Sequence, residues 1–504
     1  MATHTRQGPP KVTVWTGSTV DSQIVLDSDV VSFEVQGSLE GGYRWSVTLL
    51  PRMADARQTP GDIRRVSTLY KKLRANQVVA LGFQERGGIT LGLIDEVRRT
   101  AQHGGPQASV GLVISGSGIG KVLTRDSVVR ATLNVLDYPI FKAKVEAALG
   151  AENPLIFDIP GQWGPKDRDG IATFLMVDIQ DVVDWTLSAT ASMRLPVLAP
   201  ATGGDGRPSD YFDTSKSVTT WNKAKVYSDV YTEYQGSIWG FVKGILDADF
   251  YECWVDTTPP PLWSDFPTPH LIIRPKPYDE PAFEFAPVAE DPGITWDSLR
   301  TMVDGDPYHD IALDEVVTES LGVSDADAYA WFCVTSQFDL IANTEAQSAG
   351  LFYPLIDTYI AKHYGIAKYD ARMTLVGGDV TRRAEGQADY DAEVSAEVYE
   401  ARNRLFNWYR LNPFYESGSI TVVGRDSYRP GDPVKLGWVE LQYGTEKGAI
   451  YYCPSVRWSW QHGGHYLCTL QLTRGHNAGM VRALQLEILA DAPAANPLHY
   501  AFVG

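Results

Sequence analysis

The sequence predicts a multidomain protein of the α+β class in which antiparallel strands dominate. The 504 residues are enough for three or four domains of roughly 100–200 residues each. Two β-rich regions of comparable size, about 25–115 and about 250–380, flank a stretch with helical spacing. A third and smaller β region, 415–475, follows a long helical pattern. Together these regions predict several β modules interrupted by one mixed insert.

The first β region, 25–115, is expected to form a compact barrel or sandwich. Alternation between Val30 and Leu50 predicts two strands joined at LEGGYRW, and a basic helix is expected to begin at Pro60. The segments NQVVALGFQ and GGITLGLIDEV predict two more strands that meet at a Gly-Gly turn, and SVGLVIS predicts a fifth. Residues 1–24 are expected to be a loose N-terminal arm.

The middle of the chain is expected to hold an insert, a second β domain and a helix. Helical spacing at 121–149 and the loops after it predict a mixed helical insert at 116–248. ILDADFYECWVD and PHLIIRPKPYDEPAFEF predict strands of a second β domain at 249–380. A long helix is expected at 381–414, with an apolar stripe made of Tyr390, Val394, Val398, Leu405 and Trp408.

The last β region, 415–475, is expected to be a small barrel, followed at 476–504 by a tail with a short helix. HGGH at 462–465 predicts a hairpin turn. An even two-residue loop would set the tryptophans before it opposite a mixture of polar and apolar residues. Burial favours a register slipped by a bulge at the glycines, which aligns Trp460 with Tyr466, Trp458 with Cys468 and Val456 with Leu470.

Composition is that of a globular protein with many aromatic residues and uneven charge. The 14 Trp and 25 Tyr suit either large protein–protein contacts or carbohydrate grooves. The net charge is −18, and Lys276–Ala330 holds 14 Asp and Glu against two basic residues. That stretch is either a solvated face or a surface that repels nucleic acid. Arg52–Arg74 holds seven Lys or Arg and two Asp, on an exposed helical face or against an acidic neighbour.

The four cysteines show no CxxC spacing, so we expect free thiols and synthesis in a reducing compartment. The N-terminus has no apolar leader core, and no apolar run reaches the ~18 residues of a membrane span. The sequence therefore predicts a soluble chain that no signal peptide exports.

Motifs for chemistry are weak. SGSGIGKV at 115–122 departs from the Walker pattern at Ser115 and Val122, and is expected to be a strand-to-helix turn. A zinc site from Cys453, Cys468, His462 and His465 has no standard spacing. No GxSxG or HExxH occurs, and Arg274 is expected to bond local carbonyls. We therefore expect no catalytic, cofactor-binding or metal-binding residue, and a protein that is not an enzyme.

Several segments occur in the order found in baseplate hub proteins of contractile-tailed phages and related injection machines. Over about residues 25–475 the chain resembles this family, although Ala328 or Ala330 stands where Asn is common and Ala367 where Arg is usual. The segments that carry the resemblance are GLVISGSGIGKVLTRDSV, ILDADFYECWVD, HLIIRPKPYD, HDIALDEVVTESLGVSDADAYAWFCV, YIAKHYGIAKY, GRDSYRPGDPVKL, YYCPSVRWSW and LTRG.

The resemblance implies a trimer in which each chain contributes two tube-like antiparallel β-barrels, together with a helical insert and a C-terminal small barrel. Such a ring would join the sixfold tail tube to the threefold central spike. It would line a channel that DNA traverses without specific binding. The implied partners are the tail tube protein, the central spike protein, other baseplate or tail-tip proteins and the tape measure protein. The acidic segment 276–330 becomes a candidate for the channel wall.

The implied location is the virion, at the tail baseplate or tail tip, after assembly in the host cytoplasm and without membrane insertion by this chain. Two alternatives stay open. A carbohydrate-active or receptor-binding tail protein would use the aromatic residues and would show a cleft with two carboxylates. A tail-tip protein of a non-contractile phage would share the hub core and differ only in its neighbours.

Overall fold

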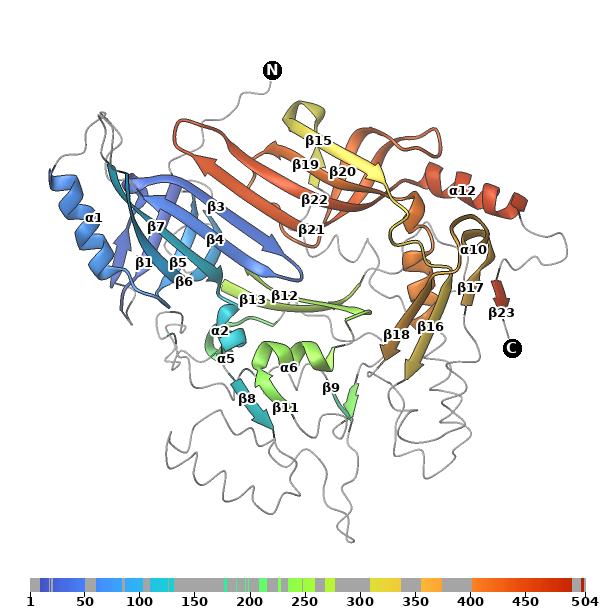
Figure 1. Ribbon diagram of the computed structural model, residues 1–504, viewed down its shortest axis with the longest axis horizontal. Helices are drawn as coiled ribbons and strands as arrows, with labels where there is room; N and C mark the ends of the chain where they lie inside the picture. The colour runs from blue at the N-terminus through green and yellow to red at the C-terminus, as the bar shows by residue number, and fades with distance from the viewer. Residues whose placement is uncertain are drawn as a thin grey trace, which may run out of the picture.

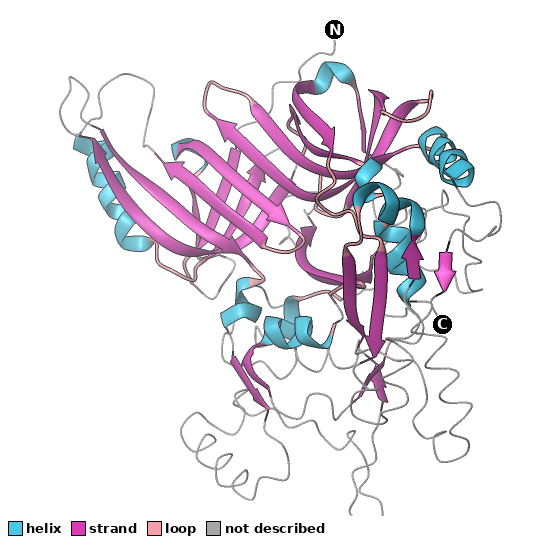
Figure 2. Ribbon diagram, turned by 45° about the vertical axis from the view of Figure 1, so that its right-hand side comes forward, coloured by secondary structure: helices cyan, strands magenta, loops and turns pink. Residues whose placement is uncertain are grey.

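A computed structural model gives the fold of the chain (Figure 1). Apart from single positions and short loops, the structure describes residues 10–49, 60–102, 109–130, 208–214, 234–258, 268–276, 309–336, 355–373, 401–491 and 500–502, with a few short pieces between 176 and 227. Strands dominate these residues, and the helices lie beside and between the sheets (Figure 2). No helix of the described chain is both long and apolar enough to cross a bilayer.

One 13-stranded sheet organises most of the described residues. Its main path contains eight successive antiparallel strands, which we call the strip: β15, β19, β22, β21, β3, β4, β7 and β6. Their bounds are Val316–Val323, Glu416–Val423, Tyr466–His476, Lys447–Gln461, Val30–Ser38, Gly42–Leu49, Ser109–Gly118 and Gly87–Gln102. Beyond β6 the sheet continues through β5 (Val78–Phe83), β1 (Pro10–Trp15) and β2 (Gln23–Val25).

The strip joins two regions that lie more than 400 positions apart in the chain. β3 pairs with β21 from Ser32 opposite Gln461 to Ser38 opposite Ser455. The Ser455 hydroxyl donates to the Gly37 carbonyl at 3.0 Å, and the backbone N–H of Leu39 donates to Pro454 at 3.1 Å. The first and last β regions are therefore halves of one sheet, and the described residues show no closed barrel.

The hairpin between β21 and β22 has the predicted slipped register. Trp460 lies opposite Tyr466, Trp458 opposite Cys468 and Val456 opposite Leu470. Gly463 has φ +70°, a backbone conformation that glycine adopts without strain. Burial of one apolar face thus selects the register.

The strands and helix predicted for 25–115 are confirmed, with α1 at Pro60–Lys72. The prediction of a loose N-terminal arm is wrong for two segments, because β1 pairs along its whole length with β5 and β2 pairs with β1. The reason is local: VTVW consists of β-branched and aromatic residues, which favour strands, and Pro10 stands at the strand start, where a missing N–H costs little.

The strands expected in the second β domain, 249–380, belong to three different sheets. β12 (Tyr251–Thr258) and β13 (Thr268–Pro275) pair with each other. β14 (His309–Ile311) pairs in parallel with β20 (Asp432–Glu440), and β15 is an edge of the strip. A four-stranded sheet contains β16 (Trp331–Ser336), β17 (Leu355–Asp357), β18 (Lys368–Met373) and β23 (Tyr500–Phe502). The described part of this region is therefore shared between sheets and does not form a barrel of its own.

Most of the expected insert, 116–248, lies outside the described residues. Its described elements include α2 (Lys121–Arg125), β8 (Ser127–Arg130), β9 (Met176–Asp178), α5 (Pro208–Tyr211), β10 (Lys225–Tyr227), β11 (Tyr234–Ser237) and α6 (Ile238–Ile245). The helix expected over 121–149 is thus wrong at 127–130, where β8 pairs with β11.

The described C-terminal helices agree with the sequence in part. Residues 401–409 are helical and bury Leu405 and Trp408, as the apolar stripe predicted, whereas 381–400 lie outside the described residues. α12 (Ala478–Asp491) is the short helix expected in the tail. β23, in the expected tail, instead pairs with β17. Short 3-10 turns occupy Asp27–Asp29, Leu313–Glu315 and Asn412–Phe414.

Candidate functional site

One face of the strip is polar and carries few charges. Alternation along each strand sends every second side chain to this face, and the strand registers align those side chains into rows. One row runs through Leu467, Ser459, Glu34, Ser46, Ser115 and Glu96. Another runs through Thr318, Thr421, Thr469, Arg457, Gln36, Arg44 and Ser117.

Hydroxyl and amide side chains dominate this polar face. They include Ser32, Gln36, Ser38, Ser46, Thr48, Ser115, Ser117, Thr318, Ser320, Ser419, Thr421, Ser455, Ser459, Gln461, Thr469 and Gln471. Thr421 and Thr469 share a hydrogen bond of 3.1 Å between their hydroxyls. Arg457 lies 2.8 Å from the Glu34 carboxylate, which neutralises one charge of each sign. The result is a wide, wettable and nearly neutral surface.

The opposite face of the strip is apolar and tightly packed. A single row crosses all eight strands through Val316, Val422, Cys468, Trp458, Val35, Trp45, Gly116 and Ile94. Trp458 is fully buried and stacks on Tyr43 at 6.1 Å between ring centroids. Phe33 lies 5.5 Å from Phe83 and 6.4 Å from Tyr466. Aromatic contacts therefore fasten the two sequence-distant halves together.

Under this apolar face, the turn RPGDPV at 429–434 gathers three segments of the chain. Arg429 lies 5.8 Å from the Trp458 ring and 3.7 Å from Asp256 of β12. Asp256 also accepts a hydrogen bond of 2.7 Å from the Tyr43 hydroxyl. Burial, and then the Asp256 charge, raise the pKa of Tyr43 well above its usual value, so its hydroxyl stays a donor.

Asp432, in the same turn, ties β14 to the large sheet. Its carboxylate accepts from the backbone N–H of Arg429 at 2.8 Å and lies 2.7 Å from Nε2 of His309. The His309 ring packs edge-on against Tyr428 at 5.0 Å. The contact between His309 and Asp432 thus supports the parallel pairing of β14 with β20.

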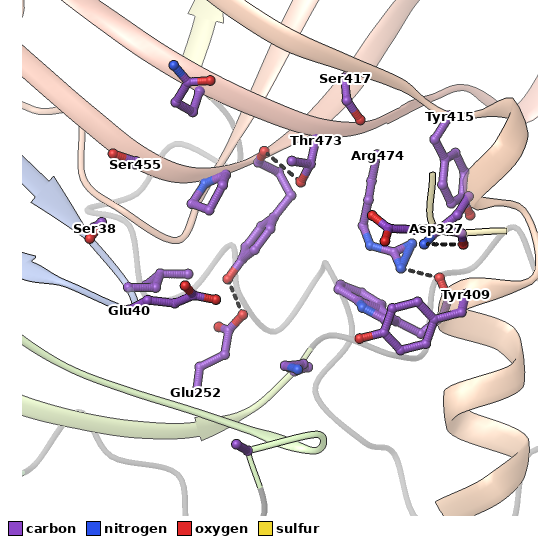
Figure 3. Close-up of a pocket in the computed structure, with 18 of the residues that line it drawn as sticks. Ser38, Glu40, Glu252, Asp327, Tyr409, Tyr415, Ser417, Ser455, Thr473 and Arg474 are labelled. Atoms are coloured by element: carbon purple, nitrogen blue, oxygen red, sulfur yellow. Dashed lines mark hydrogen bonds between the residues drawn. The ribbon is translucent and has the colours of Figure 1, made fainter. Parts of the chain in front are cut away.

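A second buried network connects β12 and β13 to β21 and includes Glu252, which Figure 3 labels. Arg274 donates to Glu252 at 3.1 Å, to the Gly431 carbonyl at 3.1 Å and to the Tyr452 hydroxyl at 3.2 Å. Tyr452 donates to the other oxygen of Glu252. Burial alone would lower the pKa of Arg274, but Tyr452 and Glu252 outweigh it and raise that pKa. The guanidinium therefore stays charged and is fully engaged.

Arg274 makes structural contacts, as expected, but its hydrogen-bond partners differ from the predicted ones. Sequence reasoning placed its hydrogen bonds on local carbonyls, whereas Gly431 and Tyr452 lie more than 150 positions away in the chain. The reason is that β13 ends beneath the 429–434 turn, so the long arginine side chain reaches a neighbouring segment.

Arg474, in the LTRG segment, holds the helical residues 401–409 against β22. Its backbone has φ +60°, uncommon for a residue with a side chain. Its guanidinium lies 3.5 Å from the centroid of the Trp408 ring and donates to the Trp408 carbonyl (Figure 3). This buried cation covers a face of the tryptophan that a sugar ring would otherwise need.

A cavity of about 740 Å³ lies between these elements. Its lining includes Glu40, Glu252, Asp327, Trp408, Arg474 and Lys276. Both oxygens of Glu252 are already bonded, to Arg274 and Tyr452, so this carboxylate is not available as a general acid or base. Burial lowers the pKa of Lys276. Of the carboxylates that line the cavity, Glu252 is therefore held in place by Arg274 and Tyr452, while those of Glu40 and Asp327 also face it.

The weak motifs have structural roles. Residues 115–118 belong to β7, and α2 begins at Lys121, whose ammonium pairs with Asp95, so SGSGIGKV is a strand-to-helix junction as expected. The four cysteines are buried free thiols. The described residues contain no cluster of potential metal ligands. Of the acidic segment, 277–308 lies outside the described residues, and its later part contributes β15 to the strip.

Sequence reasoning missed the convergence of these motifs. Glu252 and Asp256 come from one segment, Arg274 from the next, and Arg429, Asp432 and Arg474 from the last β region. All of them meet at the junction under the strip. The available signal was the presence of buried-type charges inside otherwise apolar strands, which requires partners somewhere in the fold.

No protein-family model matches the chain, and no curated protein matches it. Among solved structures it is similar to a tail protein from Neisseria meningitidis (9% identity, 94% of this chain, 99% of that chain, TM-score 0.42). It is also similar to a tail protein of prophage MuSo2 from Shewanella oneidensis (9%, 93%, 97%, 0.42). A third is a type VI secretion component from E. coli described as similar to phage T4 tail proteins gp27 and gp5 (10%, 89%, 74%, 0.37).

These structural neighbours are tail and tail-like proteins, in agreement with the resemblance seen in the sequence. At such low identities and TM-scores, the likeness by itself adds no argument about what this chain does.

Proposed function

We propose that this chain is a structural hub protein of a phage tail or a related injection machine. In this proposal three copies form a ring that joins a sixfold tail tube to a threefold central spike. The polar face of the strip lines the central channel, and the chain carries out no catalysis.

The observation that carries the proposal is the continuous strip. Two β regions from opposite ends of the chain pair through β3 and β21, so each copy offers one wide sheet with two halves. Three copies of a two-halved sheet provide six similar units around an axis. That arrangement supports a role between sixfold and threefold neighbours.

The chemistry of the polar face supports a channel wall. Bound DNA is held mainly through phosphate contacts with Lys and Arg. A wall rich in serine and threonine, in which Arg457 pairs with Glu34 and Arg98 with Glu96, offers few such contacts and stays wet, although Arg44 also lies on it. DNA would then pass without being retained. The acidic segment 276–330 would add repulsion wherever it approaches the bore.

The proposed partners are those that the family resemblance implies: the tail tube protein, the central spike protein, other baseplate or tail-tip proteins and the tape measure protein. The proposed location is the virion tail, with assembly in the host cytoplasm. Both carboxylate oxygens of Glu252 are already hydrogen-bonded, and Arg474 covers one face of the Trp408 ring. These contacts support a structural role over a carbohydrate-active one.

Electron microscopy of the purified chain, alone and mixed with its tail tube and spike proteins, tests the proposal. Class averages should show a ring of three copies with six similar lobes around an open bore, and light scattering should give three times the 55.6 kDa chain mass. A compact monomer that remains single with both partner proteins present would refute it.

A further inference from the structure

The strip ends in two edges that lack a strand partner among the described residues. β15 has β19 on one side only. β6 pairs with β5 only as far as Leu93, so its residues 95–102 have β7 on one side and no described strand on the other. Each edge presents a row of backbone N–H and C=O groups available to another strand.

β15 lacks the features that usually prevent an open edge strand from pairing with another strand. Its sequence, VVTESLGV, contains no proline and no lysine. Val317 and Val323 are 54% and 42% exposed. Natural sheets usually protect such an edge with lysine, proline or a covering segment. A strand of this composition is typical of an edge that a partner covers.

Side chains on the two free edges complement each other. On the apolar side of the strip, Arg99 of β6 lies opposite Leu112 and Glu319 of β15 lies opposite Ile420. Both charged residues therefore project to the same side of the sheet. Val97 on β6 and Leu321 on β15 also pack toward that side. Joining the edges would bring an arginine to a glutamate between apolar neighbours.

The parity of the strip fixes the direction of such pairing. All neighbours in the strip are antiparallel, and the number of strands is even, so β15 and β6 run in opposite directions. Rotation about a ring axis preserves each strand's direction along that axis. β6 of one copy and β15 of the next would therefore be antiparallel, the geometry that forms the stronger ladder.

We propose that residues 95–102 of β6 pair with β15 of a second copy of this chain, with Arg99 beside Glu319. The contact is head-to-tail, so each copy uses one edge for each neighbour, and a rotation of one third of a turn per copy would close the ring. This inference rests on the proposed trimer and adds the surfaces that build it.

Charge exchange tests the pairing. R99E and E319R should each weaken self-association by about tenfold or more, because each places like charges together, and the double variant R99E/E319R should restore it. R64E, which makes the same change of charge on the exposed side of α1, is the matched control and should associate like the wild type. Light scattering across a concentration series measures the association, and circular dichroism checks the fold.

Glu319 also accepts a hydrogen bond of 3.2 Å from Trp438 in the same chain, so a second measurement separates local from intermolecular effects. Hydrogen exchange should show amides in 95–101 and 318–322 protected in the wild-type ring and exchanging faster in R99E, which leaves Glu319 untouched. Equal exchange in the two samples would overturn the pairing.

The outcomes distinguish this inference from the proposed function. A wild-type ring that R99E and E319R leave intact would overturn the pairing while the hub proposal stands. A wild-type chain that forms no ring, alone or with tube and spike proteins, would overturn both.

Discussion

The two faces of the strip use the same backbone and differ in what they do. The apolar face holds Trp458, Trp45 and Val35 in one row, with buried arginines beneath it. The polar face, one residue away along each strand, carries Ser459, Ser46 and Glu34. The first face holds the fold together, and the second is left for function. Side-chain alternation therefore separates stability from surface chemistry in this protein.

The largest expected effect is on the apolar face. Trp458→Ala removes a fully buried indole that stacks on Tyr43 and donates to the Arg425 carbonyl at 3.3 Å. We expect the free energy of unfolding to fall by about 4 kcal/mol. Urea denaturation measures it, with Ser459→Ala on the polar face as the control. Equal losses for the two variants would contradict the division between the faces.

The buried network beneath the strip comes next. Arg274→Gln leaves the Glu252 carboxylate in a buried site without its cation. The expected loss of unfolding free energy is about 3 kcal/mol. Combining it with Glu252→Gln should cost much less than the sum of the two single changes. Strict additivity in this double-mutant cycle would show that the two residues do not act as a pair.

Close packing near the β6 end of the apolar row can be tested at Gly116. A Cβ atom there would collide with the Leu93 carbonyl oxygen and the Trp45 ring. Gly116→Ala should therefore cost about 2 kcal/mol in urea denaturation. Gly437→Ala is the control, because a Cβ at Gly437 meets nothing within 4 Å. A neutral Gly116→Ala would mean that the two strands separate easily at this point.

The burial of Cys253 on β12 and Cys468 on β22 should make the stability of the fold depend on pH. Burial raises the pKa of Cys253 and of Cys468 to about 12. In the unfolded chain a thiol ionises near pH ~8.5–9, so the stability that each contributes is present below that pH and is lost as pH rises toward 12. The expected loss at pH 10 is on the order of 1 kcal/mol per thiol.

Denaturation at pH 8 and pH 10 measures this loss, and Cys253→Ala and Cys468→Ala should each reduce it. Both thiols should also resist a thiol reagent in the native protein and react once urea unfolds it. Rapid native labelling would contradict their burial.

The smallest effect is expected on the polar face. Arg457 and Glu34 form an exposed ion pair at 2.8 Å, so Arg457→Ala should change the unfolding free energy by at most about 0.5 kcal/mol, and less in high salt. A loss of several kcal/mol would show that this face is also part of the core. The same variant leaves Glu34 unpaired, which makes the proposed channel wall more negative.

Sequence reasoning recovered the local elements and missed the long-range ones. Alternation and Gly-Gly turns gave β3, β4 and the hairpin of β21 and β22, including its bulged register, because burial of one face decides register within a hairpin. The pairing of Val35 with Trp458 joins segments more than 400 residues apart, and no local pattern encodes it. The same holds for Arg274, whose partners come from a turn distant in the chain.

A three-dimensional electron microscopy reconstruction of the assembled chain, alone or with its tail tube and spike proteins, would show which face of the strip lines the channel. We expect a ring of three copies whose bore is lined by the polar face, with Ser46, Ser459 and Thr469 toward the channel and the apolar row behind them. A ring whose bore is lined by other residues, with this face turned outward to solvent, would contradict it.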